Sequence, residues 1–515
     1  MMIKMLKTTD FCATLKAYRK TLITNDMKKV FCIFLSLMVL MGLSACEPET
    51  PGNPQKPDPE ESSYLTFVSS GESSVALVKV GEPSDISLEC SIDGKSWNPY
   101  TIGEAIYLLK NEVSFRAGET GNEGFSKGKD NYYQFKISGE VAAKGNIMSL
   151  LDRTCRKNDI PSYAFYSLFR DCKGLTEAPE LPVTKLEERC YGSMFKGCTS
   201  LTKAPVLPAT ELAGGCYCEM FYGCTSLIET PTLPATRMAD ECYYCMFYGC
   251  TSLTETPTLS ATVLAEGCYS TMFSGCTSLT KAPVLPAAEL SSYCYQYMFS
   301  GCTSLTTAPE LPATELAKGC YAYMFDGCTS LTTAPDLPAM ELAEGCYAAM
   351  FAGCESLTNA PALPATKLAK SCYAAMFAGC ESLTNAPALP ATKLAKSCYE
   401  LMFLDCNSLT EAPALPAMEL AENCYLGMFN TCLKLRTVPE LPATNLVVGC
   451  YSYMFKLCIV LNYVKALFID EPSESTTAEW LGDVSFTGTF VKSKDAAWDV
   501  RGNSGIPEGW TVITE

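Results

Sequence analysis

A unit of 26 residues repeats along most of the chain, and this fixed period constrains the fold more than any other feature. Gly-Cys, or a close variant, returns at this spacing from Cys172 to Cys458, and Met-Phe keeps the same step. Residues 348–373 and 374–399 are identical, so one complete unit is present twice. A constant period is typical of stacked repeats, because one unit cannot bury its apolar face alone. We therefore expect a solenoid of about 12 coils over residues 147–461.

Each unit combines a segment with apolar residues four apart and an extended segment with two prolines. Cys190, Met194 and Cys198 show the four-residue spacing, which predicts a short amphipathic helix. Apolar residues then recur at three-residue steps from Leu201, which predicts a parallel strand. Equivalents of Pro205 cannot donate to a β ladder, so we expect only about two to four paired residues per coil. The predicted fold class is an α/β repeat solenoid, leucine-rich-repeat-like, with one short parallel strand and one short helix in each coil.

One phrase of the repeat is long enough to indicate a family. It reads Met-Phe-Tyr-Gly-Cys-Thr-Ser-Leu at 220–227 and continues with Leu-Pro at 233–234. This phrase resembles the BspA-like leucine-rich repeats of Bacteroidetes surface lipoproteins. Its period is longer than the commonest form, and Ala-Pro replaces an aliphatic residue in the strand. The resemblance implies protein binding or adhesion at the cell surface, with a host or bacterial surface protein as the partner.

The N-terminal 63 residues are interpreted as an export signal and a tether. A basic start, an apolar run and a small-residue end predict a signal peptide over residues 27–45. Its end, Leu-Ser-Ala followed by Cys46, resembles a lipobox, which implies that Cys46 is acylated; an ordinary signal peptide is the alternative. Residues 1–26 precede a signal that is complete without them. We interpret them either as a spurious extension from an incorrect start site or as a long basic extension. Residues 46–63 are acidic and proline-rich, which predicts a disordered tether.

Two segments of different style flank the repeats. Residues 64–146 contain short β-rich runs separated by glycine turns, which predicts a β-sandwich domain. A turn from Ser91 to Trp97 resembles an Asp-box hairpin, which we interpret as a detail of the fold. After residue 461 the period stops, and residues 462–515 are rich in aromatic side chains. A solenoid needs closed ends, so we expect this segment to be a C-terminal cap.

The composition argues against catalysis and against nucleic-acid binding. The chain contains no histidine, which removes the commonest general base and metal ligand. Removing residues 1–45, with seven Lys or Arg and two acidic residues, changes the formal net charge from −17 to −22. Such a charge repels nucleic acid. We therefore predict no enzyme activity, no cofactor and no metal site, and a location at the outer membrane or cell surface through a lipid anchor only.

Twenty-three of the 30 cysteines occupy two positions of the repeat, those of Cys190 and Cys198. They alternate with Met and Phe on the apolar stripe, and free cysteine is a good small core residue. We predict a reduced, buried ladder, with disulfides between neighbouring coils as the alternative. Cys218 and Cys245 are extra, and we expect them to be an exposed thiol pair; a metal or redox site is the alternative.

Eleven tyrosines directly follow the first cysteine of each unit. We expect their rings to pack in the core with the hydroxyl at the surface; a recognition face is the alternative, because tyrosine is enriched at interfaces. That binding face would consist of Tyr191, Tyr217, Tyr243, Tyr269, Tyr295, Tyr321, Tyr347, Tyr373, Tyr399, Tyr425 and Tyr451.

A glycan-binding surface lipoprotein that serves carbohydrate capture is the alternative function. No tryptophan lies in any repeat, which argues against a flat aromatic platform for sugars. Trp97 of the predicted sandwich is the one place where that alternative keeps a candidate residue.

Overall fold

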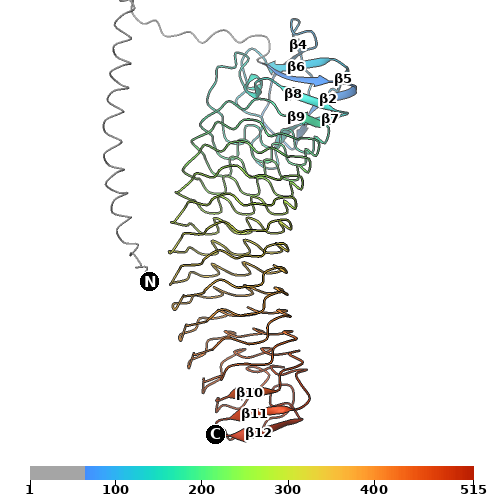
Figure 1. The fold of residues 1–515 in the computed structure, drawn as a ribbon. Helices are drawn as coiled ribbons and strands as arrows, with labels where there is room; N and C mark the ends of the chain where they lie inside the picture. The colour runs from blue at the N-terminus through green and yellow to red at the C-terminus, as the bar shows by residue number, and fades with distance from the viewer. Residues whose placement is uncertain (1–63) are drawn as a thin grey trace, which may run out of the picture. The chain divides into compact units, whose positions relative to one another are not determined.

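The computed structural model describes residues 64–515, and all of them belong to one compact unit, Pro59–Glu515. The predicted signal peptide, Cys46 and the tether lie outside the described residues. Within the unit, a stack of coils lies between N-terminal sheets and the C-terminal strands β10 to β12 (Figure 1).

The N-terminal part consists of two sheets, with strand orders β4-β3-β6-β1-β8-β9 and β5-β2-β7. Phe67 of β1 contacts Phe135 of β7, with 4.8 Å between ring centroids, so the sheets pack face to face as the β-rich runs predicted. The strands are β1 (Leu65–Ser69), β2 (Glu72–Val80), β3 (Leu88–Ser91), β4 (Asn98–Pro99), β5 (Ile106–Leu109), β6 (Glu112–Ala117), β7 (Tyr132–Ser138) and β8 (Val141–Lys144).

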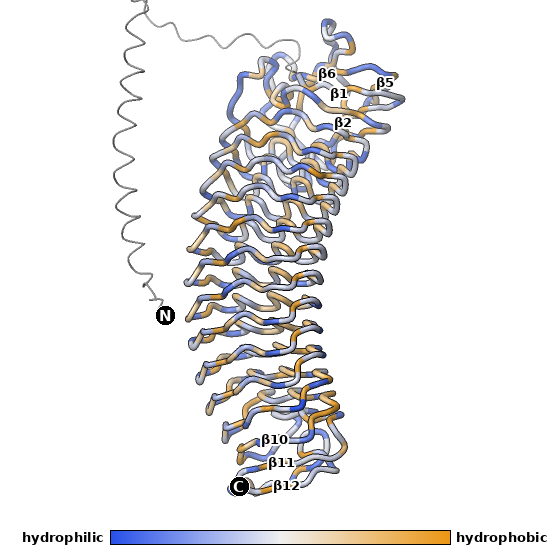
Figure 2. The backbone as a smooth tube through the Cα atoms, viewed as in Figure 1, coloured by the Kyte–Doolittle hydropathy of each residue, from blue (hydrophilic) through white to orange (hydrophobic). Residues whose placement is uncertain are grey.

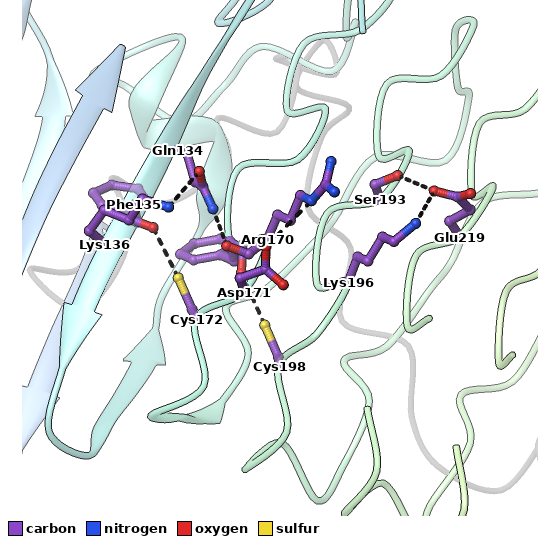
Figure 3. A network of polar contacts seen from close by, with 11 residues as sticks. Gln134, Phe135, Lys136, Arg170, Asp171, Cys172, Ser193, Lys196, Cys198 and Glu219 are labelled. Atoms are coloured by element: carbon purple, nitrogen blue, oxygen red, sulfur yellow. Dashed lines mark hydrogen bonds and ion pairs between the residues drawn. The ribbon is translucent and has the colours of Figure 1, made fainter. Parts of the chain in front are cut away.

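The sandwich continues directly into the first coil. After the 3₁₀ helix η2 (Ile147–Leu150), strand β9 (Leu175–Glu177) pairs in parallel with β8. Phe135 stacks on Phe169 of the first coil at 5.3 Å between centroids, and the Cys172 thiol donates to the Phe135 carbonyl at 3.1 Å (Figure 3). Phe135 therefore takes the place of a phenylalanine from a preceding coil, and the sandwich closes the N-terminal end of the stack.

The four-residue spacing that predicted a helix belongs to a series of consecutive turns, which we call the turn run. Backbone N–H groups alternate between two kinds of acceptor: Gln296 donates to the carbonyl of Tyr293 at 3.2 Å, whereas Tyr297 donates to that of Ala322 in the next coil at 2.9 Å. The same alternation recurs along the stack. The prediction of one short helix per coil is wrong, and residues 64–515 contain no α-helix.

Left-handed backbone at every fourth residue distinguishes these turns from a helix. The φ angles are 57° at Tyr293, 55° at Tyr297 and 71° at Gly301. An α-helix requires negative φ throughout, so each of these residues ends one turn and starts another. A four-residue unit places residues i and i+4 on one side, much as a 3.6-residue helical turn does. The apolar pattern alone therefore could not separate the two structures.

The extended segment pairs over fewer residues than predicted. Single parallel bridges such as Lys203 with Glu229 occur where we expected two to four paired residues. A second row, for example Glu289 with Glu315, lies beyond the second proline and was not predicted. Prolines between the two rows lack the N–H that a continuous ladder needs.

Columns of identical side chains form the core of the stack. Ring centroids of successive ladder tyrosines are 5.7–6.0 Å apart, and those of successive phenylalanines 5.4–5.8 Å. Apolar segments accordingly recur from coil to coil (Figure 2). Met298, Phe299 and Leu305 have no exposed surface. Burial of such columns between neighbouring coils is the main source of stability in a repeat stack.

The ladder cysteines add a hydrogen bond to this core. The thiol of Cys302 donates to the carbonyl of Phe273 in the preceding coil at 3.1 Å, and equivalent bonds run from Cys172 to Cys458 at 3.0–3.2 Å. The same carbonyl accepts the backbone N–H of Cys276, so both of its lone pairs are used. The ladder cysteines form no disulfides and their thiols are buried, in agreement with the predicted reduced ladder.

The C-terminal segment closes the other end of the stack. Strands β10 (Tyr463–Ala466), β11 (Gly488–Lys492) and β12 (Trp510–Thr514) form a parallel sheet. Phe455 donates its N–H to the carbonyl of Trp480 at 2.9 Å, as phenylalanines within the stack do to the next coil. Trp480 is fully buried and lies 6.2 Å from Tyr451 between ring centroids, which covers the last tyrosine of the column.

Deleting residues 374–399 should shorten the stack by one coil and leave its stability nearly unchanged, because the identical copy at 348–373 presents the same surface to the next coil. Deleting residues 374–386 should abolish folding, since a turn run would then face an extended segment. Thermal unfolding followed by circular dichroism compares the two variants. Equal destabilisation by both deletions would contradict the stacked-coil structure.

The stack of coils should unfold in one steep transition between about pH 9 and pH 11. Burial raises the pKa of Cys302 well above its usual value, and it does the same for Tyr295. These groups keep their protons to a higher pH in the folded chain than in the unfolded chain. They therefore contribute their full stabilisation of the folded chain below the unfolded-state pKa, and this contribution falls as the pH rises above it. Each buried thiol removes about 1.4 kcal/mol of stability per pH unit in that range. Circular dichroism measured against pH follows the transition. A stack of coils that stays folded above pH 11 would contradict this prediction.

Candidate binding surface

Each turn run has a buried side and an outward side. The outward positions are those of Arg189, Gly192, Ser193 and Lys196 and their equivalents in other coils, and we call them the turn face. Small residues at these positions are covered by their neighbours, whereas larger side chains reach the surface. The turn face is therefore the part of each coil where a change of residue alters the surface and leaves the core intact.

The turn face differs from coil to coil, although the core positions hardly change. Cysteine, tyrosine, methionine and phenylalanine return unit after unit at the buried positions. The turn face instead carries charged, aromatic, hydroxyl and aliphatic residues in different coils. The equivalents of Ser193 illustrate this variety: Glu219, Cys245, Thr271, Tyr297, Tyr323, Ala349, Ala375 and Leu401.

The tyrosines proposed from the sequence as a binding face do not form one. All eleven, from Tyr191 to Tyr451, expose at most 2% of their surface. They directly follow the first buried cysteine of the turn run, where the backbone directs both side chains into the stack. The Tyr191 hydroxyl is buried without a hydrogen-bond partner, and burial raises its pKa well above the usual value. The expectation that these hydroxyls lie at the surface is therefore wrong as well.

A second set of tyrosines occupies the turn face. Tyr222 stacks on Tyr248 with 4.5 Å between ring centroids, and Tyr297 stacks on Tyr323 at the same distance. The side chains are half-buried, except that Tyr244 is 37% exposed. Their irregular placement was the signal available in the sequence, because other coils carry other residue types at these positions. We call this set the tyrosine patch: Tyr222, Tyr244, Tyr248, Tyr293, Tyr297 and Tyr323.

One end of the tyrosine patch holds an internal ion pair. The Lys196 ammonium lies 4.1 Å from the ring centroid of Tyr222 and 2.9 Å from a carboxylate oxygen of Glu219. Ser193 donates a hydrogen bond to the same carboxylate at 2.9 Å (Figure 3). Burial alone would raise the pKa of Glu219, but the hydrogen bonds from Lys196 and Ser193 outweigh it and hold the pKa below its usual value. The ion pair is therefore formed and ordered at neutral pH.

Cys218 and Cys245 are not the exposed thiol pair that we expected. Their side chains are only 3% and 6% exposed. Arg189 covers Cys218 and donates a hydrogen bond to its sulfur at 3.0 Å. Burial raises the pKa of both thiols to about 11, so they are protonated at neutral pH.

The sandwich does not present Trp97 as an open platform. The Arg116 guanidinium lies 3.9 Å from its ring centroid, and Tyr64 packs edge-on at 4.9 Å. The adjoining turn is held by Asp93, which accepts hydrogen bonds from the N–H groups of Lys95 and Ser96. These hydrogen bonds hold the pKa of Asp93 below its usual value, and they account for the Asp-box-like sequence as a turn.

Within residues 64–515, no group of three or more Cys, Asp or Glu side chains is arranged to hold a metal ion. No helix in the same range is both long and apolar enough to cross a membrane.

Comparison with known proteins gives one match. The family model described as "BspA type Leucine rich repeat region" matches residues 191–332 and 318–462, which together are more than half of the chain. No curated protein matches the chain.

Proposed function

Because this chain belongs to the BspA-type leucine-rich-repeat family, we propose that it is a lipid-anchored cell-surface protein that binds another protein through its tyrosine patch. Repeats of this family are associated with surface protein binding and adhesion, and they are typically non-catalytic modules. The tyrosine patch is the single observation that carries the choice of surface.

The composition of the tyrosine patch suits a protein partner. Tyrosine supplies a large contact area for the loss of only two side-chain torsions, and serine supplies adaptable hydrogen bonds. Both occur here, since the coil between the two tyrosine stacks carries Ser270, Thr271 and Ser274 on the turn face. Stacking of Tyr297 on Tyr323 restricts both rings before any partner binds, which lowers the entropic cost of association.

Charged side chains on the other surfaces of the coils are paired in part between neighbouring coils. On the extended segments, Lys203 pairs with Glu229 at 2.9 Å. At the start of a turn run, Lys396 pairs with Glu422 at 2.7 Å. The turn face carries only small residues in the two coils that follow the coil of Tyr323. These two coils carry only alanine at three of its positions: Ala348, Ala349, Ala352, Ala374, Ala375 and Ala378.

The anchor rests on the sequence of the export signal. Cys46 follows Leu-Ser-Ala at the end of an apolar run, and the acidic residues that come next are typical of a tether. Residues 46–63 would then link the binding unit to the lipid.

A variant with Tyr222→Ala, Tyr297→Ala and Tyr323→Ala should lose binding to a protein that the wild type binds on an array of extracellular and bacterial surface proteins. We expect at least a tenfold loss of affinity, because truncated interface tyrosines cost about 1–2 kcal/mol each. Tyr453→Ala is the matched control: this tyrosine also lies on the turn face, is 37% exposed and is outside the patch.

The same preparation on a glycan array separates the alternative function. Binding to a protein that survives in the triple variant would show that the tyrosine patch is not the binding surface. Saturable binding to glycans, with none to proteins, would replace the proposed function by carbohydrate capture.

Substituting Cys46→Ser should release the protein from the membrane fraction, because the cysteine thiol is the atom that carries the lipid. Metabolic labelling with a fatty-acid analogue measures the modification, and Cys90→Ser is a control outside the signal. Label that persists in Cys46→Ser would refute the lipid anchor.

A further inference from the structure

At one site on the turn face, a lysine of the chain itself lies over the outer ring of a tyrosine stack. Lys196 lies over Tyr222, the first ring of the Tyr222–Tyr248 stack, and pairs with Glu219. A cation over an aromatic ring beside a carboxylate gains both the ring quadrupole and the ion pair. Glu219 and Tyr222 are three residues apart in one turn run, so the backbone places the carboxylate beside the ring.

The second stack repeats these components without the cation. Tyr297 stacks on Tyr323 at 4.5 Å with an interplanar angle of 12°, close to the geometry of the first stack. Asp326 follows Tyr323 by three residues, so an aromatic ring and a carboxylate again share one turn run, in the reverse order. The Ser300 hydroxyl, three residues after Tyr297, lies 3.3 Å from a carboxylate oxygen of Asp326, which places the carboxylate beside the turn run of Tyr297.

Asp326 lacks the partner that Glu219 has. Its one side-chain hydrogen bond comes from the Ser300 hydroxyl at 3.3 Å, and no lysine or arginine within residues 64–515 pairs with it. The carboxylate is half-buried, and burial raises its pKa because one hydroxyl does not replace the lost hydration. An incoming cation would supply the missing compensation.

The following coil leaves space beside this pair of rings. At the positions equivalent to Tyr323 and Asp326 it carries Ala349 and Ala352, whose side chains end at Cβ. No long side chain of that coil can therefore cover the ring and the carboxylate, as Lys196 covers Tyr222.

We propose that Tyr297, Tyr323 and Asp326 form a receptor for a single lysine or arginine side chain presented by the protein partner. This inference rests on the proposed function and specifies its chemistry: the partner carries an exposed basic residue at the centre of the contact. The net charge of the chain, −17, attracts such a partner in general, and the receptor fixes where its cation binds.

Arginine methyl ester is the probe, because it carries the side chain alone and needs no identified partner. The protein is labelled with 3-fluorotyrosine, and the fluorine resonances of Tyr297 and Tyr323 are assigned by substituting each with phenylalanine. The ester should shift these two resonances saturably at physiological ionic strength. Citrulline methyl ester, which has the same shape without the side-chain charge, should leave them unchanged.

Two variants with opposite expected effects make the test specific. Asp326→Asn should weaken arginine binding about tenfold, the effect of losing one charge-assisted contact. Asp336→Asn, in the same coil but on the extended segment, is the matched control and should have no effect. Lys196→Ala should create a second responsive site, in which the Tyr222 resonance begins to shift with the ester.

Absence of a saturable shift in the wild type, or equal binding by Asp326→Asn and Asp336→Asn, would overturn the receptor. Either result is independent of the protein array. If the array shows a protein that binds the wild type but not the variant without the tyrosines, the proposed function is still supported. Only the inference that the partner contributes a basic residue would then be abandoned.

Discussion

The structure depends on backbone hydrogen bonds that run from one turn run to the next. Every second N–H in a turn run points along the stack and donates to a carbonyl of the following coil, as Tyr297 does to Ala322 at 2.9 Å. The intervening N–H groups close the turns internally. Because both kinds of bond are satisfied in every coil, the polar backbone can be buried under columns of apolar side chains at little cost. The thiol bond from Cys302 to the Phe273 carbonyl ties the coil of Tyr297 to the preceding coil as well.

This ladder also separates the constant part of the sequence from the variable part. The left-handed residue at every fourth position directs two side chains inward and two outward, so core and surface residues alternate within one short run. The inward residues must match those of the neighbouring coils, which explains the unchanged Cys, Tyr, Met and Phe columns. The outward residues have no such constraint, and that freedom allows Tyr297, Tyr323 and Asp326 to lie together on one part of the turn face.

The sequence predicted the stacked repeats and the buried thiols, because these follow from the period and from the type of residue at each position. It did not reveal the turn run, since Cys190, Met194 and Cys198 fit a four-residue turn as well as a helix. The tyrosines considered as a binding face were misassigned for a related reason. Without the direction of the backbone, Tyr191 looked as available as Tyr222, although one is fully buried and the other lies on the turn face.

Far-ultraviolet circular dichroism of the purified protein tests the turn ladder most directly, because turn runs and helices bury the same residues but differ in φ at every fourth position. We expect a spectrum dominated by turns and short β segments, without the paired minima of an α-helix. A helical signal of the size expected for one short helix per coil would contradict the ladder, and with it the placement of the turn face.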